Sequence, residues 1–227
     1  MPEAPLPGPP GPLGLLGGTF DPIHFGHLRL AEEAREALDL AAVHWIPAGQ
    51  PPHRQAPCVA AAHRLEMVRR ALAGNPDFTV DDAETRSAAP SYTVTTLERL
   101  RAAAGSRPLV LLMGADAFLG LAAWHRWRDL FTLAHIGVAT RPGFELSAEE
   151  MPVELAEACA QRLGRNPGAL REAPAGRVVA FAMTPLAISA SLLRARLAAG
   201  QSVRYLLPDP VREYIDQHYL YRMPDGR

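Results

Sequence analysis

The chain reads Gly17-Gly18-Thr19-Phe20-Asp21-Pro22-Ile23-His24-Phe25-Gly26-His27 over residues 17–27. An apolar run, Leu13–Leu16, precedes this stretch and predicts a first strand, and the amphipathic pattern of Leu28–Leu40 after it predicts a helix. A strand, a glycine-rich turn and a helix together bring backbone N–H groups and a helix N-terminus up to a phosphate. Histidines three residues apart on a first helical turn share one face, so both can contact the same anion.

Strand-like apolar runs alternate with helical patterns along the rest of the chain. Further strands are predicted at Ala42–Ile46, Phe78–Val80, Leu109–Met113, Ile136–Ala139 and Val178–Met183, and helices at Val59–Ala73, Tyr92–Ala104, Met151–Leu163, Ser189–Ala199 and Pro208–His218. This alternation predicts an α/β fold, a Rossmann-like doubly wound parallel sheet with helices on both faces. In such sheets ligands bind beyond the carboxyl ends of the strands. Ser91 is a candidate helix cap, and Ser147–Gly176 is expected to leave the sheet.

Length and composition predict one globular domain. The 227 residues are 48% hydrophobic and 21% charged, which fits a single domain over 13–221 between a proline-rich disordered tail, 1–12, and a C-terminal tail, 222–227. The N-terminus has neither a basic region nor a long apolar run, so no signal peptide or membrane span is expected there. Cys58 and Cys159 lie far apart without a C-x-x-C pair, which argues against a disulfide framework and favours the cytoplasm.

The charged residues limit the possible ligands. The net charge is −1, so no global basic field favours a nucleic-acid partner. All 23 basic residues are arginine, which excludes the phosphate-binding lysine of a P-loop. A phosphate must therefore be held by arginine, histidine, hydroxyl groups and backbone, and arginine can bind it with two parallel hydrogen bonds.

Two other roles for the histidine pair stay open at this point. A structural zinc ion would need third and fourth ligands, and no cluster of Cys or His lies near His24 and His27 in the sequence. The pair could also cap the helix or lie in the core.

A second motif, Ile188-Ser189-Ala190-Ser191-Leu192-Leu193-Arg194, stands at the predicted start of a late helix. With Gly17–His27, it resembles the H-x-G-H and Ile-Ser-x-Ser/Thr signatures of the nucleotidyltransferases that share an ATP-binding α/β domain with class I aminoacyl-tRNA synthetases. Within that superfamily the chain resembles the bacterial nicotinate-mononucleotide adenylyltransferases from about Leu13 to about Tyr221. The segments that carry this resemblance are Pro51-Pro52-His53-Arg54, Pro90–Leu97, Gly114-Ala115-Asp116, Trp124-His125-Arg126-Trp127, Thr140-Arg141-Pro142-Gly143 and Leu207–Ile215.

Three positions depart from the pattern of that family. Arg54 replaces a lysine, Ala190 replaces the middle residue of a Ser-Ser-Thr run, and His125 stands where the family often has an aromatic residue.

The resemblance implies adenylyl transfer from ATP to nicotinate mononucleotide, which yields deamido-NAD and pyrophosphate in NAD biosynthesis. It implies that Mg²⁺ accompanies ATP, and it assigns no protein ligand to the metal. The implied catalytic residues are His24, His27 and Arg194. The other implied ATP-binding residues are Gly17, Gly18, Thr19, Phe20, Gly114, Asp116, Ser189 and Ser191. The implied residues for the second substrate are His53, Arg54, Tyr92, Thr93, Trp124, His125 and Arg141.

Without the resemblance, many of these residues have structural explanations. Ser189, Ser191 and Asp116 could be N-caps, Trp124 and Trp127 core residues, Tyr92 and Thr93 cap and core residues, and His53, Arg54 and Arg141 solvated loop residues. Arg194 is different, because a helix N-terminus disfavours a cation and a bound phosphate would remove that conflict.

Three other functions remain as alternatives. Pantetheine-phosphate adenylyltransferases share the His-x-Gly-His fingerprint but have no reason to carry the Ser-Tyr-Thr and Trp-x-x-Trp blocks. An adenylyltransferase for nicotinamide mononucleotide differs only in hydrogen-bond polarity at the pyridine ring. A nucleotide-binding sensor without activity is the third. Small-molecule substrates are the expected partners, with no membrane or nucleic acid, and a homo-oligomer is possible.

Overall fold

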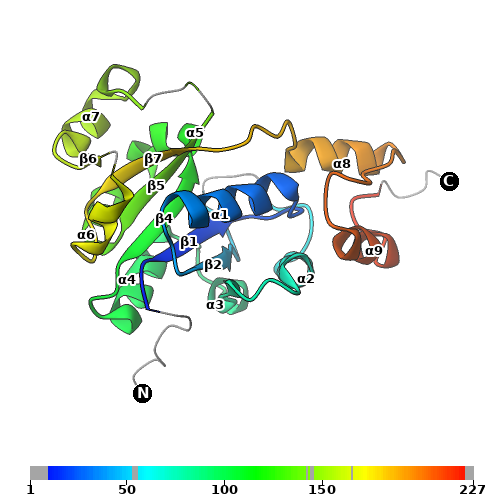
Figure 1. Ribbon diagram of the computed structural model, residues 1–227. Coiled ribbons are helices and arrows are strands. Elements are labelled where there is room, and N and C mark those ends of the chain that lie inside the picture. Colours follow the sequence, from blue (N-terminus) through cyan, green and yellow to red (C-terminus); the bar gives the residue numbers. More distant parts are fainter. Residues whose placement is uncertain (1–9, 53–55, 142, 144–145, 165, 223–227) are drawn as a thin grey trace.

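Parallel strands build one central sheet (Figure 1). The computed structural model describes residues 10–52, 56–141, 143, 146–164 and 166–222. Within these residues the sheet has seven strands in the order β3-β2-β1-β4-β5-β7-β6, and every neighbouring pair is parallel. The strands are β1 (Leu13–Gly18), β2 (Ala42–Pro47), β3 (Phe78–Val80), β4 (Leu109–Gly114), β5 (His135–Thr140), β6 (Leu163–Gly164) and β7 (Val178–Ala182). The strand order reverses at β1, between β2 and β4, where such folds bind ligands.

Helices cover both faces of this sheet, as the alternating pattern predicts (Figure 1). They are α1 (Phe25–Ala37), α2 (Ala61–Leu72), α3 (Ala83–Arg86), α4 (Thr93–Ala104), α5 (Ala115–Leu119), α6 (Leu130–Leu133), α7 (Val153–Cys159), α8 (Ala190–Ala198) and α9 (Asp209–Gln217). Residues of α1, α2, α8 and α9 pack into one core, and residues of α4 to α7 pack into the other. None of the described helices is long and apolar enough to cross a membrane.

The apolar runs of the central strands serve both cores at once. In β4, Leu109, Leu111 and Met113 face one core, while Val110 and Leu112 face the other. Successive side chains of a strand point to opposite faces, so a strand buried on both faces reads as continuously apolar. This explains why the predicted strands agree with the structure within a few residues.

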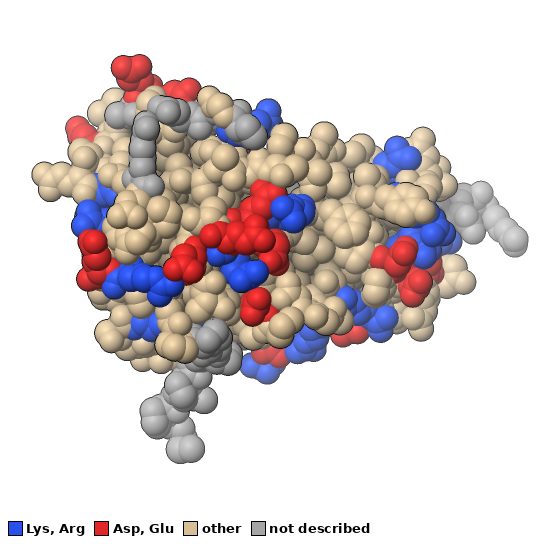
Figure 2. Space-filling view, in the orientation of Figure 1, with Lys and Arg blue, Asp and Glu red and all other residues tan. Residues whose placement is uncertain are grey.

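Surface charges on the described residues are mixed in sign. On the face seen in Figure 2, arginines and carboxylates lie in joint clusters rather than in separate areas. Ion pairs between neighbouring turns of a helix also occur, such as Arg35 with Glu32 of α1 at 2.8 Å. This face therefore offers no broad basic surface of the kind that nucleic-acid-binding proteins use.

The structure corrects several predicted boundaries. The helix predicted over Leu28–Leu40 begins at Phe25, because His24 is its N-cap. The helix predicted over Met151–Leu163 covers only Val153–Cys159. Residues Leu163–Gly164 instead form β6, which pairs with β7, so the segment that was expected to leave the sheet supplies its edge strand.

Ser91 does not cap α4, contrary to the prediction. The N-cap of α4 is Tyr92, and no side chain bonds to that helix start. The Oγ of Ser91 instead accepts from the N–H groups of Gly49 at 3.0 Å and Gln50 at 3.1 Å. The hydroxyl therefore joins the loop after β2 to the start of α4.

The end of the predicted N-terminal tail is held to the body of the protein. The Ala41 N–H donates to the carbonyl of Pro12 at 2.9 Å, and Arg107 Nε donates to the carbonyl of Gly11 at 2.9 Å. These two bonds join Gly11 and Pro12, at the end of the predicted tail, to residues near β2 and β4. Residues 1–9 and 223–227 of the predicted tails lie outside the described residues.

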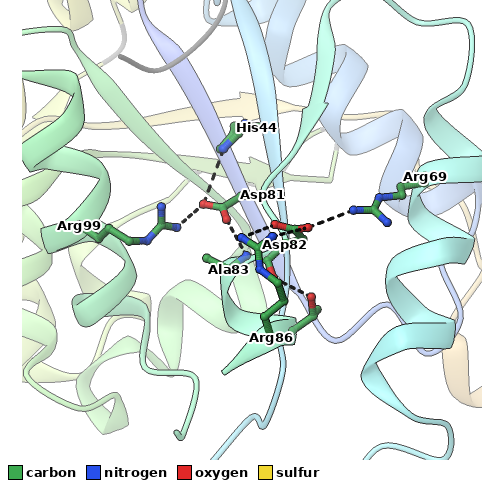
Figure 3. A network of polar contacts seen from close by, with 8 residues as sticks. His44, Arg69, Asp81, Asp82, Ala83, Arg86 and Arg99 are labelled. Carbon is green, nitrogen blue, oxygen red and sulfur yellow. Dashed lines mark hydrogen bonds and ion pairs between the residues drawn. The ribbon is translucent and has the colours of Figure 1, made fainter. Parts of the chain in front are cut away.

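A network of charged groups fixes the short helix α3 beside β2 and α4 (Figure 3). The buried carboxylate of Asp81 pairs with Arg99 of α4, lies 3.7 Å from His44 of β2, and accepts from the Ala83 N–H at 2.9 Å. Burial alone would raise the pKa of Asp81, but these three contacts hold that pKa well below its usual range. Asp81 therefore stays ionised and keeps α3 in place.

Gly49 packs directly against the backbone of α3. A Cβ at this position would lie 2.1 Å from the carbonyl oxygen of Glu84. Because a backbone atom cannot move aside as a flexible side chain can, only glycine fits where the loop after β2 passes α3.

We expect Gly49→Ala to lower the free energy of unfolding by about 1–3 kcal/mol, the usual cost of forcing an extra carbon into a packed site. Urea denaturation measures the change. The matched control is Gly164→Ala on the edge strand, because a Cβ there meets open space and the backbone needs no positive φ. Equal unfolding midpoints for the two variants would contradict the expectation.

Candidate active site

Two cavities lie next to each other beyond the carboxyl ends of β1, β2 and β4. They have volumes of about 410 Å³ and about 420 Å³. Both are lined by Gly17, Gly18, Thr19 and His27, so they share a floor made by the end of β1 and the start of the loop after it. We call the first the aromatic cavity and the second the arginine cavity, after the side chains described below. The glycine-rich stretch therefore lies at the centre of the site.

His24 and His27 cap α1 with their side chains. The Nδ1 of His24 accepts from the Gly26 N–H at 3.1 Å, and the His24 N–H donates to Nδ1 of His27 at 3.3 Å. The two rings stack with their centroids 3.8 Å apart. Because each Nδ1 accepts a backbone N–H, each neutral ring carries its proton on Nε2 and can donate from there.

The two histidines differ in their access to the cavities. His27 lines both cavities, whereas His24 is 5% exposed and lines neither. Burial lowers the pKa of His24 to about 4, so its ring is neutral at pH 7. The structure therefore realises the capping alternative for His24 and places it behind His27, which is the histidine that faces the ligand space.

Packing around the histidines explains two glycines of the motif, Gly18 and Gly26. A Cβ at Gly26 would lie 3.0 Å from the His24 ring, and a Cβ at Gly18 would lie 2.8 Å from the Phe20 ring. The buried Phe20 ring in turn meets His27 edge to face, with centroids 5.1 Å apart. The sequence pattern Gly-Gly-x-Phe…His-x-Gly-His thus allows these three rings to pack behind the shared floor.

The arginine cavity brings together the two motifs at the ends of the chain. It is lined by Phe20 and Asp21 from the first motif and by Ala190 and Arg194 from the second. Arg194 Nη1 donates to the carbonyl of Asp21 at 2.8 Å. This bond holds the guanidinium on the wall of the cavity that His27 also lines, so a cation and an N–H donor face the same space.

Ser189 and Ser191 lie at the start of α8 and line neither cavity. Ser189 is the N-cap, because its Oγ accepts from the Leu192 N–H at 3.2 Å. The Oγ of Ser191 lies 3.1 Å from that of Ser189, and both residues are exposed. The capping role that the sequence left open for Ser189 is therefore present.

The aromatic cavity contains most of the residues expected at the second substrate. Tyr92, Thr93, Trp124 and His125 line it, and Gly114 at the end of β4 lines it too. The rings of Tyr92 and His125 lie 4.4 Å apart at an angle of 36°. Trp127, the second tryptophan of that block, is instead buried in the core. Flat apolar walls of this kind suit an aromatic ring of a ligand.

Four further expected residues are not placed in the cavities. Asp116 is exposed on α5 and lines neither cavity; the N-cap of that helix is Gly114, so the capping alternative for Asp116 is wrong. Arg141 is exposed after β5 and lines neither cavity. His53 and Arg54 lie outside the described residues, although Pro51 and Pro52 before them line the aromatic cavity.

Arg64 is a residue of the site that the sequence analysis missed. Its side chain is 1% exposed and donates to the carbonyls of Thr19 at 2.7 Å, Ala48 at 2.5 Å and Gly49 at 2.9 Å. It thereby joins the loops after β1 and β2 from beneath the cavities. A signal was present, because Arg64 precedes Val68 by four residues and so lies on the apolar face of its helix.

Among the described residues, no group of three or more His, Cys, Asp and Glu side chains could hold a metal ion. The zinc alternative for His24 and His27 therefore finds no third ligand in that part of the chain.

Comparisons with known proteins agree with this geometry. Residues 15–196 match the family model described as Cytidylyltransferase-like. The probable nicotinate-nucleotide adenylyltransferase of Dechloromonas aromatica is 58% identical over 212 residues, which cover 93% of this chain and 98% of the relative. The chain belongs to the nicotinate-nucleotide adenylyltransferase family. A further member, the probable nicotinate-nucleotide adenylyltransferase of Halorhodospira halophila, is 50% identical, with 93% of this chain and 96% of the relative covered.

Solved structures share the fold at low sequence identity. Plasmodium falciparum nicotinic acid mononucleotide adenylyltransferase, in a complex with NaAD, superposes with a TM-score of 0.71 at 13% identity, covering 93% of this chain and 97% of that one. A putative nicotinate-nucleotide adenylyltransferase from Vibrio parahaemolyticus gives 0.61 at 14% identity, with 94% and 97% covered. The α/β sheet with its helices is therefore the architecture that this family shares.

The buried His24 makes the stability of this family member depend on pH. Its pKa falls from 6.5 to about 4 on folding, so between these values the unfolded chain binds a proton that the native protein does not. Stability is then lost as the pH falls through this window. At pH 5 the loss from this residue is about 2 kcal/mol relative to pH 7.5.

We expect His24→Asn to remove most of that loss, because asparagine caps helices without titrating. Urea denaturation of both proteins at pH 5 and pH 7.5 measures it. The buried His135, whose pKa burial also lowers, contributes equally to both proteins and cancels in the comparison. An identical pH dependence for the two proteins would show that His24 does not titrate in this way.

Proposed function

We propose that the protein transfers the adenylyl group of ATP to the 5′-phosphate of nicotinate mononucleotide, forming deamido-NAD and pyrophosphate in NAD biosynthesis. The observation that carries this proposal is the pair of cavities joined over the floor of Gly17, Gly18 and Thr19. One cavity offers a guanidinium and a histidine, and the other offers aromatic walls. The names of the relatives, nicotinate-nucleotide adenylyltransferases, support the same reaction.

The reaction needs no nucleophile from the protein. An oxygen of the nicotinate mononucleotide phosphate attacks the α-phosphorus of ATP, and the bond between that phosphorus and the bridging oxygen to the β-phosphorus breaks as pyrophosphate leaves. The attacking group is already an anion, so no base has to take a proton from it. Catalysis then consists of holding the two phosphates in line and stabilising the charge that develops on the transferred group.

We assign the stabilisation of that charge to His27 and Arg194. His27 offers an Nε2–H, because its Nδ1 is taken by the backbone N–H of His24. Arg194 offers the remaining donors of a guanidinium whose Nη1 is held by the Asp21 carbonyl. The N-terminus of α1 adds its partial positive charge. We assign the ATP phosphates to the arginine cavity, between these groups, with His24 holding His27 from behind.

The aromatic cavity is the proposed site of the pyridine ring. Trp124 and the Tyr92–His125 pair provide faces for stacking. Thr93 begins α4, and a helix start favours an anionic group such as the nicotinate carboxylate. We propose that this end of the cavity distinguishes the acid from the amide.

Magnesium enters the proposal as part of the ATP substrate. Mg²⁺ keeps several waters and binds phosphate oxygens in preference to dedicated protein cages, so we assign it to the ATP phosphates.

Cys58 and Cys159 are free thiols, which fits the reducing cytoplasm as the compartment of the reaction.

An assay of pyrophosphate release tests the proposed reaction. Purified protein with ATP and Mg²⁺ is offered nicotinate mononucleotide, nicotinamide mononucleotide or phosphopantetheine in parallel. We expect the highest kcat/KM with nicotinate mononucleotide, with deamido-NAD identified by mass. Preference for either other substrate would replace the proposed one, and binding of ATP without turnover of any of the three would indicate a sensor.

We expect His27→Ala to lower kcat by about 10²- to 10³-fold, the usual effect of removing one donor aimed at the developing charge. The KM for nicotinate mononucleotide should change little, because Trp124, Tyr92 and His125, which we propose stack on its pyridine ring, are unchanged. Steady-state kinetics measure both values. His218→Ala, at the exposed end of α9, serves as the histidine control. An unchanged kcat in His27→Ala would remove His27 from the catalytic machinery.

A further inference from the structure

Asp21 is a buried carboxylate at the wall of the arginine cavity. It is 5% exposed and lies between the glycine floor and the His24 cap. Its Oδ2 accepts from the Cys58 N–H at 2.7 Å, and its backbone carbonyl accepts from Arg194 Nη1 at 2.8 Å. One residue thus holds the loop before α2 with its side chain and the cavity arginine with its backbone.

The remaining oxygen of Asp21 binds a residue from the far end of the chain. The hydroxyl of Tyr221 donates to Asp21 Oδ1 at 2.7 Å. The chain folds back after α9 to reach it, with the Leu220 N–H bonded to the Ile215 carbonyl at 3.0 Å. Burial and the neighbouring carboxylate of Asp21 raise the pKa of Tyr221, so the hydroxyl keeps its proton and remains a donor at any physiological pH.

A second contact joins the same regions. The Phe25 N–H, in the first turn of α1, donates to the carbonyl of Leu206 at 3.2 Å. The segments on both sides of α9 therefore contact the loop that carries the histidines. Tyr221 is the member of this contact that reaches the cavity wall.

The charge of Asp21 explains why such a donor matters. A carboxylate on the wall of a cavity that binds polyphosphate repels the ligand unless its oxygens are occupied by donors. In the structure each carboxylate oxygen accepts one short hydrogen bond, and the guanidinium of Arg64 lies near enough to interact with the charge. Without the Tyr221 hydroxyl, Oδ1 would lack this partner, and the backbone that orients Arg194 would lose one of its fixed points.

We propose that Tyr221 is a positioning residue for ATP, whose hydroxyl fixes Asp21 and thereby the orientation of Arg194 in the arginine cavity. The inference rests on the proposed function, because it assigns the ATP phosphates to that cavity. Tyr221 itself does not touch the reacting atoms. The nicotinate mononucleotide side of the site, which lies in the aromatic cavity, is independent of this contact.

The test replaces Tyr221 by phenylalanine, which keeps the ring and removes the hydrogen bond. A hydrogen bond to a charged group is worth enough for us to expect kcat/KM for ATP to fall by about 10- to 100-fold. The KM for nicotinate mononucleotide should stay within about twofold, because its proposed site is the aromatic cavity. A distortion of the whole site would raise this KM as well. Tyr219→Phe is the control, because Tyr219 belongs to the same segment and is 73% exposed.

A double-mutant cycle with Asp21→Ala separates positioning through Asp21 from a direct effect of the hydroxyl. We expect Tyr221→Phe to change kcat/KM for ATP less than about twofold in the Asp21→Ala background. The dissociation constant of a non-hydrolysable ATP analogue, measured by calorimetry below the melting temperature of each variant, gives a second readout that needs no turnover. It should rise in Tyr221→Phe and not in Tyr219→Phe.

The outcomes separate a failure of the Tyr221 inference from a failure of the proposed function. Unchanged ATP parameters in Tyr221→Phe, a KM for nicotinate mononucleotide that rises as much as the KM for ATP, or a full effect in the Asp21→Ala background would overturn the inference. A wild-type protein that forms no deamido-NAD would refute the proposed function instead. In that case the calorimetric comparison still reports whether Tyr221 supports nucleotide binding.

Discussion

A single buried guanidinium holds the floor of the site in place. Arg64 donates to carbonyls of the loops after β1 and β2, and it makes these bonds where water cannot replace them. A buried charge that loses its partners is strongly unfavourable, so the two loops cannot separate without a large cost in free energy. The glycine floor, the histidine caps and both cavities are built on these loops and depend on that constraint.

The two motifs at the ends of the chain meet because of the strand order. The loop after β1 lies where the strand order of the sheet reverses, and the helix that carries Arg194 follows β7, far along the sequence. The backbone carbonyl of Asp21, in the first motif, accepts from Arg194 in the second. This hydrogen bond helps to fix where Arg194 lies relative to His27. The shape of the arginine cavity thus follows from contacts between segments that are remote in sequence.

Much of this architecture was predictable from local patterns. Strands buried on both faces read as apolar runs, and the His-x-Gly-His stretch marks a helix start with two ring nitrogens on one face. Long-range polar contacts were not predictable in this way. No local sequence pattern indicates that Asp21 binds Tyr221. The same holds for the bonds from the Gly49 and Gln50 N–H groups to Ser91. The different positions of His24 and His27 could not be predicted either, since the two residues are of the same type and only the structure shows that His24 is buried and that His27 lines the cavities. Arg64 stands between these cases, because its place on an apolar helix face was visible but the backbone carbonyls that it binds were not.

The fixed ring of His27 bears on the direction of the proposed reaction. Its Nδ1 accepts a backbone N–H, so the neutral ring carries its proton on Nε2, and in the reaction that we propose it donates to the ATP phosphates without accepting a proton. Arginine does not give up its proton either. In the proposed reaction the site holds charge and passes no protons, so its donors contact the same transition state whether the pyrophosphate is leaving or returning. As with any catalyst, the direction of net flow is then set by how quickly pyrophosphate and dinucleotide are removed.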